Sequence, residues 1–208
     1  KDLPRPEVFT EKSFILPTKI YDRTGNVLLY KIYDEEKRTV ISLDQVPDYL
    51  KQAAIAAEDA NFYHHFCLDI RGILRSVLNN LKIGKPIYGG STISQQLIRS
   101  TFLTLDKTLQ RKVKEAILTL ELERRYSKDQ ILEFYLNQVP FGSNAYGVEA
   151  ASQTFFGKPV SQTSLAEAAI LASLIQAPSR LSPYGSNAED LYARKNYILD
   201  RMVKEGYL

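Results

Sequence analysis

The sequence has a single cysteine and no long run of apolar residues. Cys67 has no second cysteine to pair with, so the chain forms no internal disulfide. No stretch reaches the roughly 18 apolar residues of a transmembrane helix, and no secretory signal peptide is recognisable. The single cysteine leaves the redox compartment open. An anchor upstream of residue 1 would leave no trace in this sequence.

An excess of charge of one sign is also lacking. The 27 basic and 24 acidic residues give a net charge of +3, too weak by itself to indicate a nucleic-acid-binding protein. Any useful positive field must therefore come from local clusters. The sequence has no repeat and no low-complexity segment, and its 44% hydrophobic residues can supply a core for one large domain or two small lobes.

The first forty residues carry the only convincing strand signal. Residues 1–17 contain three prolines and are predicted to be a tether. Residues 18–30, with a turn at 22–26, are typical of a β-hairpin, and a third extended piece is expected near 38–41.

From Ser42 onward the spacing of apolar residues predicts helices and hence a mainly α fold. Residues 145–156 are expected to form one of them, closed by Gly157. Capping boxes at Thr92–Gln95, Ser127–Gln130 and Ser164–Glu167 mark three helix starts. One further helix is expected to start near Pro47, with a face of Leu50, Ala53, Ala54 and Ala57, and another to run from Ile70 to Leu81. A third is marked by Leu109, Val113, Ala116, Ile117 and Leu120, and a last one is expected from Asn187 to about Lys204.

Glu58 is the first candidate for chemistry. If the helix from Pro47 continues past it, Glu58, Phe62 and His65 share one face and Asp59 is turned aside. A carboxyl group beside an aromatic ring and after an alanine run is partly desolvated, which raises its pKa and suits it to act as a general base. The simpler interpretation is that Glu58-Asp59 ends a helix at the surface.

Glu115 lies instead among cations, next to Arg111, Lys112 and Lys114. A surface ion-pair ladder is the simpler interpretation. Arg99 and Lys107 add two more cations, and Gly89-Gly90 leads into a predicted helix N-terminus, so the stretch could hold a diphosphate. Two carboxylates in such different surroundings are suited to different roles.

A membrane contact is the remaining hypothesis drawn from the residues alone. The stripe from Ile70 to Leu81 is more typical of a core helix, and the loop at 82–88 is the better candidate for a membrane surface.

The motifs together resemble the glycosyltransferase domain of bacterial class A penicillin-binding proteins and the monofunctional peptidoglycan glycosyltransferases, which are family 51 glycosyltransferases. Five ordered blocks between about residues 58 and 199 carry the resemblance. They read Glu58-Asp59-x-x-Phe62-x-x-His65, Gly89-Gly90-Ser91-Thr92-Ile93-x-Gln95-Gln96, Arg111-Lys112-x-x-Glu115, Lys128-x-x-Ile131-Leu132-Glu133-x-Tyr135-Leu136-Asn137, and Arg194-x-x-x-Ile198-Leu199. The family usually has glycine where this chain has Cys67, so local strain is expected there.

The resemblance implies a lysozyme-like helical fold over residues 18–208, with a smaller membrane-facing lobe at roughly 66–110. It implies polymerisation of lipid II into β-1,4-linked glycan strands with inversion and release of undecaprenyl diphosphate. It also implies a place on the extracytoplasmic face of the bacterial cytoplasmic membrane, with an anchoring N-terminal helix before residue 1. The growing lipid-linked glycan and the inhibitor moenomycin are the other implied partners, with no nucleic acid.

The resemblance also implies roles for the motif residues. Glu58 is the general base and Glu115 the second catalytic carboxylate, a candidate ligand for Mg²⁺ or Mn²⁺ if the reaction uses one, with no organic cofactor. The implied donor-side residues are Ser91, Thr92, Gln95, Gln96, Arg99, Lys107, Arg111, Lys112 and Lys114. The implied supporting residues are Asp59, Phe62, His65, Lys128, Tyr135, Asn137 and Arg194.

The cation cluster favours transfer over hydrolysis. A diphosphate leaves without a proton when cations neutralise its charge, whereas a glycosidase needs a general acid. Two other hypotheses stay open: a lysozyme-like enzyme that cleaves glycan, and a non-catalytic module that binds glycan or lipid diphosphate.

Overall fold

The computed structural model describes residues 18–21, 23–24, 26, 28–32, 37–66, 91–103 and 108–208. Several predictions lie outside the described residues: those for the tether at 1–17, Cys67, the helix and loop at 70–88, Gly89-Gly90 and Lys107. Most of the predicted lobe at 66–110 lies outside them as well.

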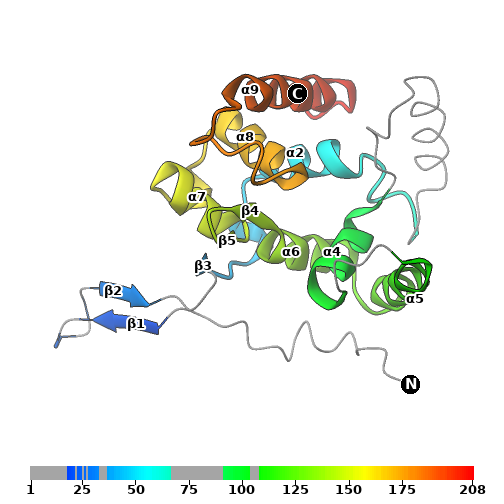
Figure 1. Ribbon diagram of the computed structural model, residues 1–208, viewed down its shortest axis with the longest axis horizontal. Helices are drawn as coiled ribbons and strands as arrows, with labels where there is room; N and C mark the ends of the chain where they lie inside the picture. The colour runs from blue at the N-terminus through cyan, green and yellow to red at the C-terminus, as the bar shows by residue number, and fades with distance from the viewer. Residues whose placement is uncertain are drawn as a thin grey trace.

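The predicted hairpin is confirmed. Strands β1 (Thr18–Tyr21) and β2 (Leu28–Ile32) pair antiparallel, and Figure 1 shows them apart from the helices. The extended piece that follows, β3 (Lys37–Arg38), runs parallel to β5 (Ala145–Tyr146), which also pairs with β4 (Pro140–Gly142). The start of the described helical body is thus tied to a segment about a hundred residues later.

The helix predicted over 145–156 is wrong at its start. The helix α7 spans Val148–Phe156, closed by Gly157 in the left-handed conformation, because Ala145–Tyr146 belongs to the small sheet. Ser143 and Asn144 both have positive φ, as a tight hairpin turn requires. Gly147 has a φ of 82°, and a Cβ there would lie 2.7 Å from the backbone oxygen of Asn137, so this position needs glycine.

A mainly α fold is confirmed, with seven α-helices in the part of the chain that the structure describes. The three predicted capping boxes are all present. None of the helices described is both long and apolar enough to cross a membrane. Besides α7, the helices are α2 (Asp48–Glu58), α4 (Ile93–Phe102), α5 (Leu109–Arg125), α6 (Lys128–Gln138), α8 (Leu165–Gln176) and α9 (Ala188–Lys204), with short 3-10 turns at Leu43–Gln45 and Val160–Gln162.

Helix α8 is the most buried helix, and α2 and α9 pack against it (Figure 1). Of the predicted face of α2, Leu50, Ala53 and Ala54 are buried and Ala57 is half-buried. Ala53 shares a buried cluster with Ala56, which was not predicted, and with Ala169 and Ala172 of α8. These small side chains bring the helix backbones close together. On the other side of the molecule, α4 packs on both α5 and α6. The end of α2 therefore meets elements from both halves of the helical body.

The helix predicted from the apolar residues between Leu109 and Leu120 is confirmed as α5, but three of those residues lie on its exposed side. Val113, Ile117 and Leu120 are 53%, 47% and 43% exposed, whereas Leu118 and Leu122 are buried. The sequence pattern fitted either face, because apolar residues occur on both sides of this helix. Packing against α4 selects the face that also carries Glu115.

Candidate active site

Helix α2 ends at Glu58, so the condition for a shared helical face of Glu58, Phe62 and His65 is not met. Asp59 has φ −158° and ψ 72°, outside the helical region, and residues 60–66 form turns. Phe62 and His65 therefore do not extend a helical face from Glu58. The Asp59 carboxylate has partners outside the helix, which favours the break.

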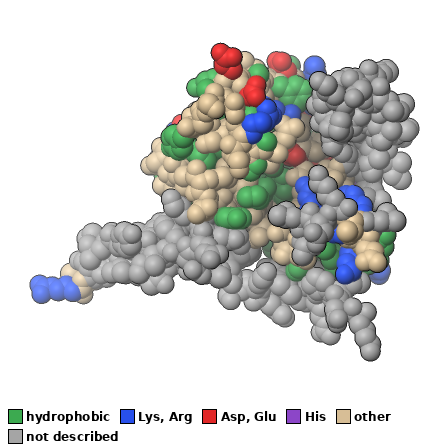
Figure 2. Space-filling model, in the orientation of Figure 1, with side chains coloured by type: hydrophobic (Ala, Val, Ile, Leu, Met, Phe, Trp, Pro, Cys, Tyr) green, Lys and Arg blue, Asp and Glu red, His purple; other side chains and the backbone are tan. Residues whose placement is uncertain are grey.

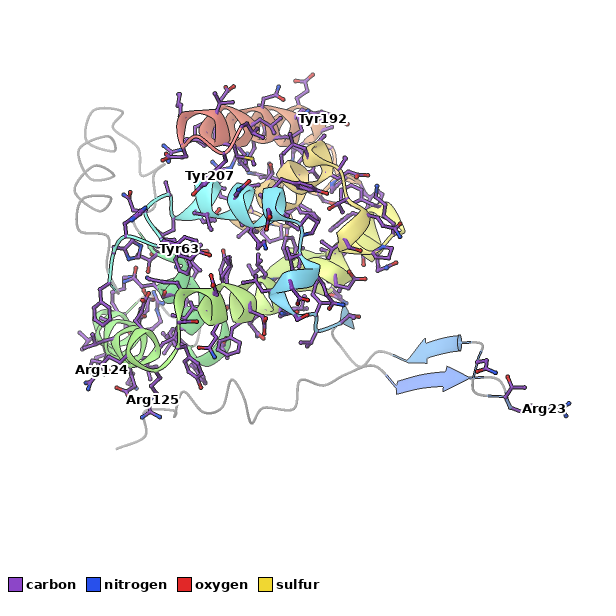
Figure 3. The ribbon with its side chains drawn as sticks, turned by 180° about the vertical axis from the view of Figure 1, so that it is seen from behind. Arg23, Tyr63, Arg124, Arg125, Tyr192 and Tyr207 are labelled. Carbon is purple, nitrogen blue, oxygen red and sulfur yellow. The ribbon has the colours of Figure 1, made fainter. Side chains whose placement is uncertain are left out.

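Asp59 is buried rather than turned aside. Its two carboxylate oxygens lie 2.8 and 2.9 Å from His65 Nε2, and Oδ2 also accepts the backbone N–H of Ile93 at 3.1 Å. These contacts fasten the turn after α2 to the first residue of α4. Phe62 is fully buried in the same turn, and Figure 3 shows its neighbour Tyr63 at the edge of this region.

Two helices contact Glu58 directly, and a third acts through one of them. Its Oε2 accepts the side-chain N–H of Gln96 on α4 at 2.9 Å, and the Tyr135 hydroxyl on α6 donates to Gln96 Oε1 at 3.1 Å. Arg194 of α9 places Nη2 at 3.7 Å from Glu58 Oε1. The Glu58 side chain is only 11% exposed. The structure thus brings together Glu58, Gln96, Tyr135 and Arg194.

Burial is the main reason why the pKa of Glu58 is raised above 4.5. The hydrogen bond from Gln96 and the charges of Arg194 and Arg99 act in the opposite direction, and the neighbouring Asp59 adds to the increase. A carboxyl group with a raised pKa in a site lined by polar groups is suited to proton transfer.

The predicted donor-side residues of the second motif lie at and along α4. Thr92 and Gln95 cap each other, because Thr92 Oγ1 accepts the N–H of Gln95 and Gln95 Oε1 accepts the N–H of Thr92 at 3.0 Å. Ser91 is half-buried just before them, and Arg99 is exposed near the end of the helix. A direct structural role is therefore visible for the capping pair, whereas Arg99 is accessible.

Glu115 is fully buried on the inner face of α5 but is surrounded by cations. Its two oxygens pair with Arg111, at 3.0 Å, and with Lys112. Lys114 is exposed on the same helix. Glu58 and Glu115 are both buried, but their partners differ as the sequence predicted: Glu115 pairs with two cations, whereas the hydrogen bond to Glu58 comes from the neutral amide of Gln96.

A divalent cation does not fit Glu115 as it stands. Magnesium and manganese prefer several oxygen ligands, yet both Glu115 oxygens already pair with cationic side chains. In the described ranges, no three His, Cys, Asp or Glu side chains come together as a metal site.

Sequence reasoning missed Glu123 and Ser94. Glu123 is nearly buried and accepts a hydrogen bond from Lys128 at 2.8 Å and another from Ser94. Lys128 also lies 4.7 Å from the centre of the Phe62 ring, which adds a cation–π contact. No local pattern distinguishes Glu123 from Glu121, which pairs with Arg125 at the surface.

Asn137 acts at a distance from Glu58. Its side chain accepts the N–H of Ile41 at 3.0 Å and donates to the Ile41 carbonyl at 2.8 Å. This pair of bonds joins α6 to the segment that enters α2. A supporting position for Asn137 agrees with these contacts.

Known proteins provide an independent comparison. The family model described as Transglycosylase matches residues 25–203. Penicillin-binding protein 1A from Aquifex aeolicus (strain VF5) is 43% identical over 208 residues, which is 100% of this chain and 28% of that protein. Penicillin-binding protein 1A from Escherichia coli (strain K12) is 43% identical over 205 residues, 98% of this chain and 24% of that protein.

A crystal structure of penicillin-binding protein 1A from Haemophilus influenzae matches with a TM-score of 0.49 and 24% identity, covering 94% of this chain and 19% of that chain. The chain spans about a quarter of the length of the curated relatives. The family match covers most of the chain and contains every residue described around Glu58. The chain therefore belongs to the transglycosylase family, as an enzyme domain of the kind found in class A penicillin-binding proteins.

Proposed function

We propose that this domain polymerises lipid II into β-1,4-linked glycan strands, with inversion at the anomeric carbon and release of undecaprenyl diphosphate. The observation that carries the proposal is Glu58 itself: a buried carboxyl group with a raised pKa, held by Gln96 and Arg194. In this reaction Glu58 removes the proton from the 4-hydroxyl of the acceptor sugar. That oxygen then attacks the anomeric carbon of the donor.

The leaving group needs positive charge rather than a proton. Arg99 is exposed near the end of α4, within range of Glu58 for their charges to interact. On α5, Glu115 holds Arg111 and Lys112, while Lys114 is exposed. We assign these cations, together with Lys107, to the donor diphosphate and Glu115 to their organisation, so no step of this proposal requires a protein-held metal.

The decisive experiment is incubation of labelled lipid II with the wild-type chain and with Glu58→Gln. The wild type should produce polymer, and the variant should lose at least about a hundredfold in rate because the amide cannot accept the proton. Glu121→Gln is the matched control, since Glu121 pairs with Arg125 at the surface of α5. Substantial activity of Glu58→Gln would overturn the assignment of the base.

The same assay separates the two competing functions. Cleavage of purified glycan without polymer formation would identify a lysozyme-like hydrolase. Binding of lipid II without any turnover, in the membrane-reconstituted full-length protein, would identify a non-catalytic module.

We also propose that the domain works at the extracytoplasmic face of the cytoplasmic membrane. The exposed apolar side chains of α5 support a membrane contact, and Figure 2 shows basic and hydrophobic side chains beside one another over this helix. Apolar residues flanked by cations are typical of helices that lie on an anionic membrane surface. Moenomycin, the inhibitor expected at the donor site, remains a predicted ligand.

A further inference from the structure

The two carboxylate oxygens of Glu58 have different surroundings. Oε2 accepts a hydrogen bond from Gln96, whereas Oε1 is buried and receives none from the described part of the chain. Arg194 Nη2 lies 3.7 Å from Oε1, too far for a hydrogen bond. A buried acceptor without a donor is costly and uncommon. Oε1 therefore offers a place for a donor that arrives with a ligand.

Tyr135 determines how the Gln96 side chain is turned. The buried Tyr135 hydroxyl donates to Gln96 Oε1 at 3.1 Å. Burial, and then the charge of Glu58, raise the pKa of Tyr135 far above its usual value, so the phenol keeps its proton and stays a donor. Because this bond occupies the amide oxygen, the amide nitrogen must face Glu58.

We propose that Tyr135 and Gln96 are positioning residues that fix Glu58 so that Oε1 alone receives the proton of the acceptor sugar. The acceptor O–H bond breaks, its proton moves to Oε1, and the oxygen bonds to the donor's anomeric carbon while the diphosphate departs with the bonding electrons. This inference rests on the proposed function for the identity of the proton donor. It adds the choice of oxygen and the two residues that enforce it.

The charges around Glu58 leave a distinct task for Gln96. Arg194 from α9 and Arg99 from α4 favour the ionised carboxylate, whereas Asp59 and burial oppose it. Neither arginine donates a hydrogen bond to Oε2, so Gln96 alone holds that oxygen among the described contacts. Without Gln96 the carboxylate would lose a stabilising donor, and its two oxygens would be free to exchange places.

The test compares Tyr135→Phe and Gln96→Met with the wild type. Both variants should shift the acidic limb of the kcat profile upward, by up to about one pH unit, and lower kcat about tenfold at low pH with little change in KM. The pKa of Glu58 should rise in the same variants without substrate. Infrared spectra of protein labelled with ¹³C-carboxyl glutamate give this pKa, after the spectrum of Glu58→Gln is subtracted.

Tyr49→Phe is the matched control. The Tyr49 hydroxyl donates to the backbone oxygen of Thr163, so this variant also removes one tyrosine hydrogen bond. It should lower thermal stability but leave the kcat profile and the pKa of Glu58 unchanged.

The two readouts separate this inference from the proposed function. An unchanged pKa of Glu58 in both Tyr135→Phe and Gln96→Met would overturn the positioning role even if lipid II is polymerised. Loss of kcat by the same factor at every pH would likewise overturn it, as this would indicate only a structural role. A pKa of Glu58 that rises in both variants, in a protein whose wild type polymerises nothing, would retain the hydrogen-bond relay but overturn its task in proton transfer.

Discussion

Glu58 is an acidic side chain that is almost completely buried in the folded protein. Burial disfavours the ionised form of Glu58, whereas the Gln96 amide and the guanidinium groups of Arg194 and Arg99 favour it. Burial has the larger effect, so the pKa of Glu58 lies above its ordinary value. A site that keeps a base partly desolvated is expected to reduce stability, as is common where function requires strain.

We therefore expect Glu58→Gln to stabilise the fold at neutral pH. Because the folded pKa is raised, the stability associated with protonated Glu58 is complete below the unfolded value, near 4.5, and is lost as pH rises toward the folded value. Glutamine avoids this loss, and a gain of about 1 kcal/mol is expected. Thermal melts at several values between pH about 5 and about 8 should show a gain that grows with pH. A melting temperature below that of the wild type at neutral pH would contradict the expectation.

Arg99 is the described cation best placed to act on a ligand beside Glu58. It is exposed, yet its charge reaches the buried carboxylate. Arg99→Ala should weaken moenomycin binding by roughly tenfold, as expected for one charge-assisted hydrogen bond of about 1.5 kcal/mol, measured by fluorescence polarisation. Arg124→Ala, at the exposed end of α5, should bind as the wild type does. Equal affinities for the wild type and Arg99→Ala would remove Arg99 from the donor site.

At the scale of single elements, α4 is the helix that links the surroundings of Glu58 to those of Glu115. It carries Gln96 and Arg99 toward Glu58 and packs on α5, which carries Glu115. Its first turn is held by the Thr92–Gln95 capping box and by Asp59. The position of this helix should therefore influence activity more than that of a helix with an equivalent cap elsewhere.

Thr92→Ala and Ser164→Ala test this expectation. Each removes the N-cap of a capping box, on α4 and on α8 respectively, and each should cost about 1 kcal/mol of unfolding free energy. Only Thr92→Ala should also reduce polymerisation, because α4 carries Gln96 to Glu58 whereas α8 has no such described contact. Equal losses of activity in the two variants, at matched stability, would show that α4 has no special role.

The exposed face of α5 leads to a prediction about membranes. Ile117→Asp should reduce binding to vesicles that contain anionic phospholipid by roughly tenfold or more, since it replaces apolar area with a charge of the wrong sign. Val203→Asp, which changes an exposed apolar residue on α9, should bind as the wild type does. Cosedimentation with vesicles measures both. Equal binding by the two variants would contradict a membrane contact through α5.

At the scale of the whole molecule, the packing of α2, α8 and α9 sets the distance between Glu58 and Arg194. Ala53 is fully buried in the apolar cluster where these helices meet. The helices can lie this close only while the interface remains small. The site thus depends on residues that touch no ligand.

Ala53→Leu should destabilise the fold by about 1–3 kcal/mol, the usual cost of overpacking a core. It should also lower polymerisation, because moving α2 from α9 separates Glu58 from Arg194. Ala193→Leu on the exposed side of α9 should stay within about 0.5 kcal/mol of the wild type. Urea unfolding measures the stability and the lipid II assay measures the activity. Full activity of Ala53→Leu would show that the site does not depend on the packing of α2 at Ala53.

The sequence predicted well what depends on neighbours along the chain. The capping boxes, the hairpin, and the ion pairs of Glu115 with Arg111 and Lys112 were all accessible, since hydrogen bonds and charges three or four residues apart are set by local geometry. The motif spacing was enough to indicate the family, which the comparisons confirm. Local signals did not reveal the small sheet at 140–146, whose strands are too short to show a pattern.

Tertiary structure decided the arrangement around Glu58. The end of α2 depends on Asp59 finding His65 and the first N–H of α4, and the contact between Glu58 and Gln96 joins residues 38 apart. The buried face of α5 was likewise chosen by α4, not by its own pattern. By itself the sequence determined the helices, their caps and the charges that they carry, because these follow from short-range interactions. Only long-range packing decided which partners the buried Glu58 and Glu115 carboxylates meet and which face of α5 remained exposed.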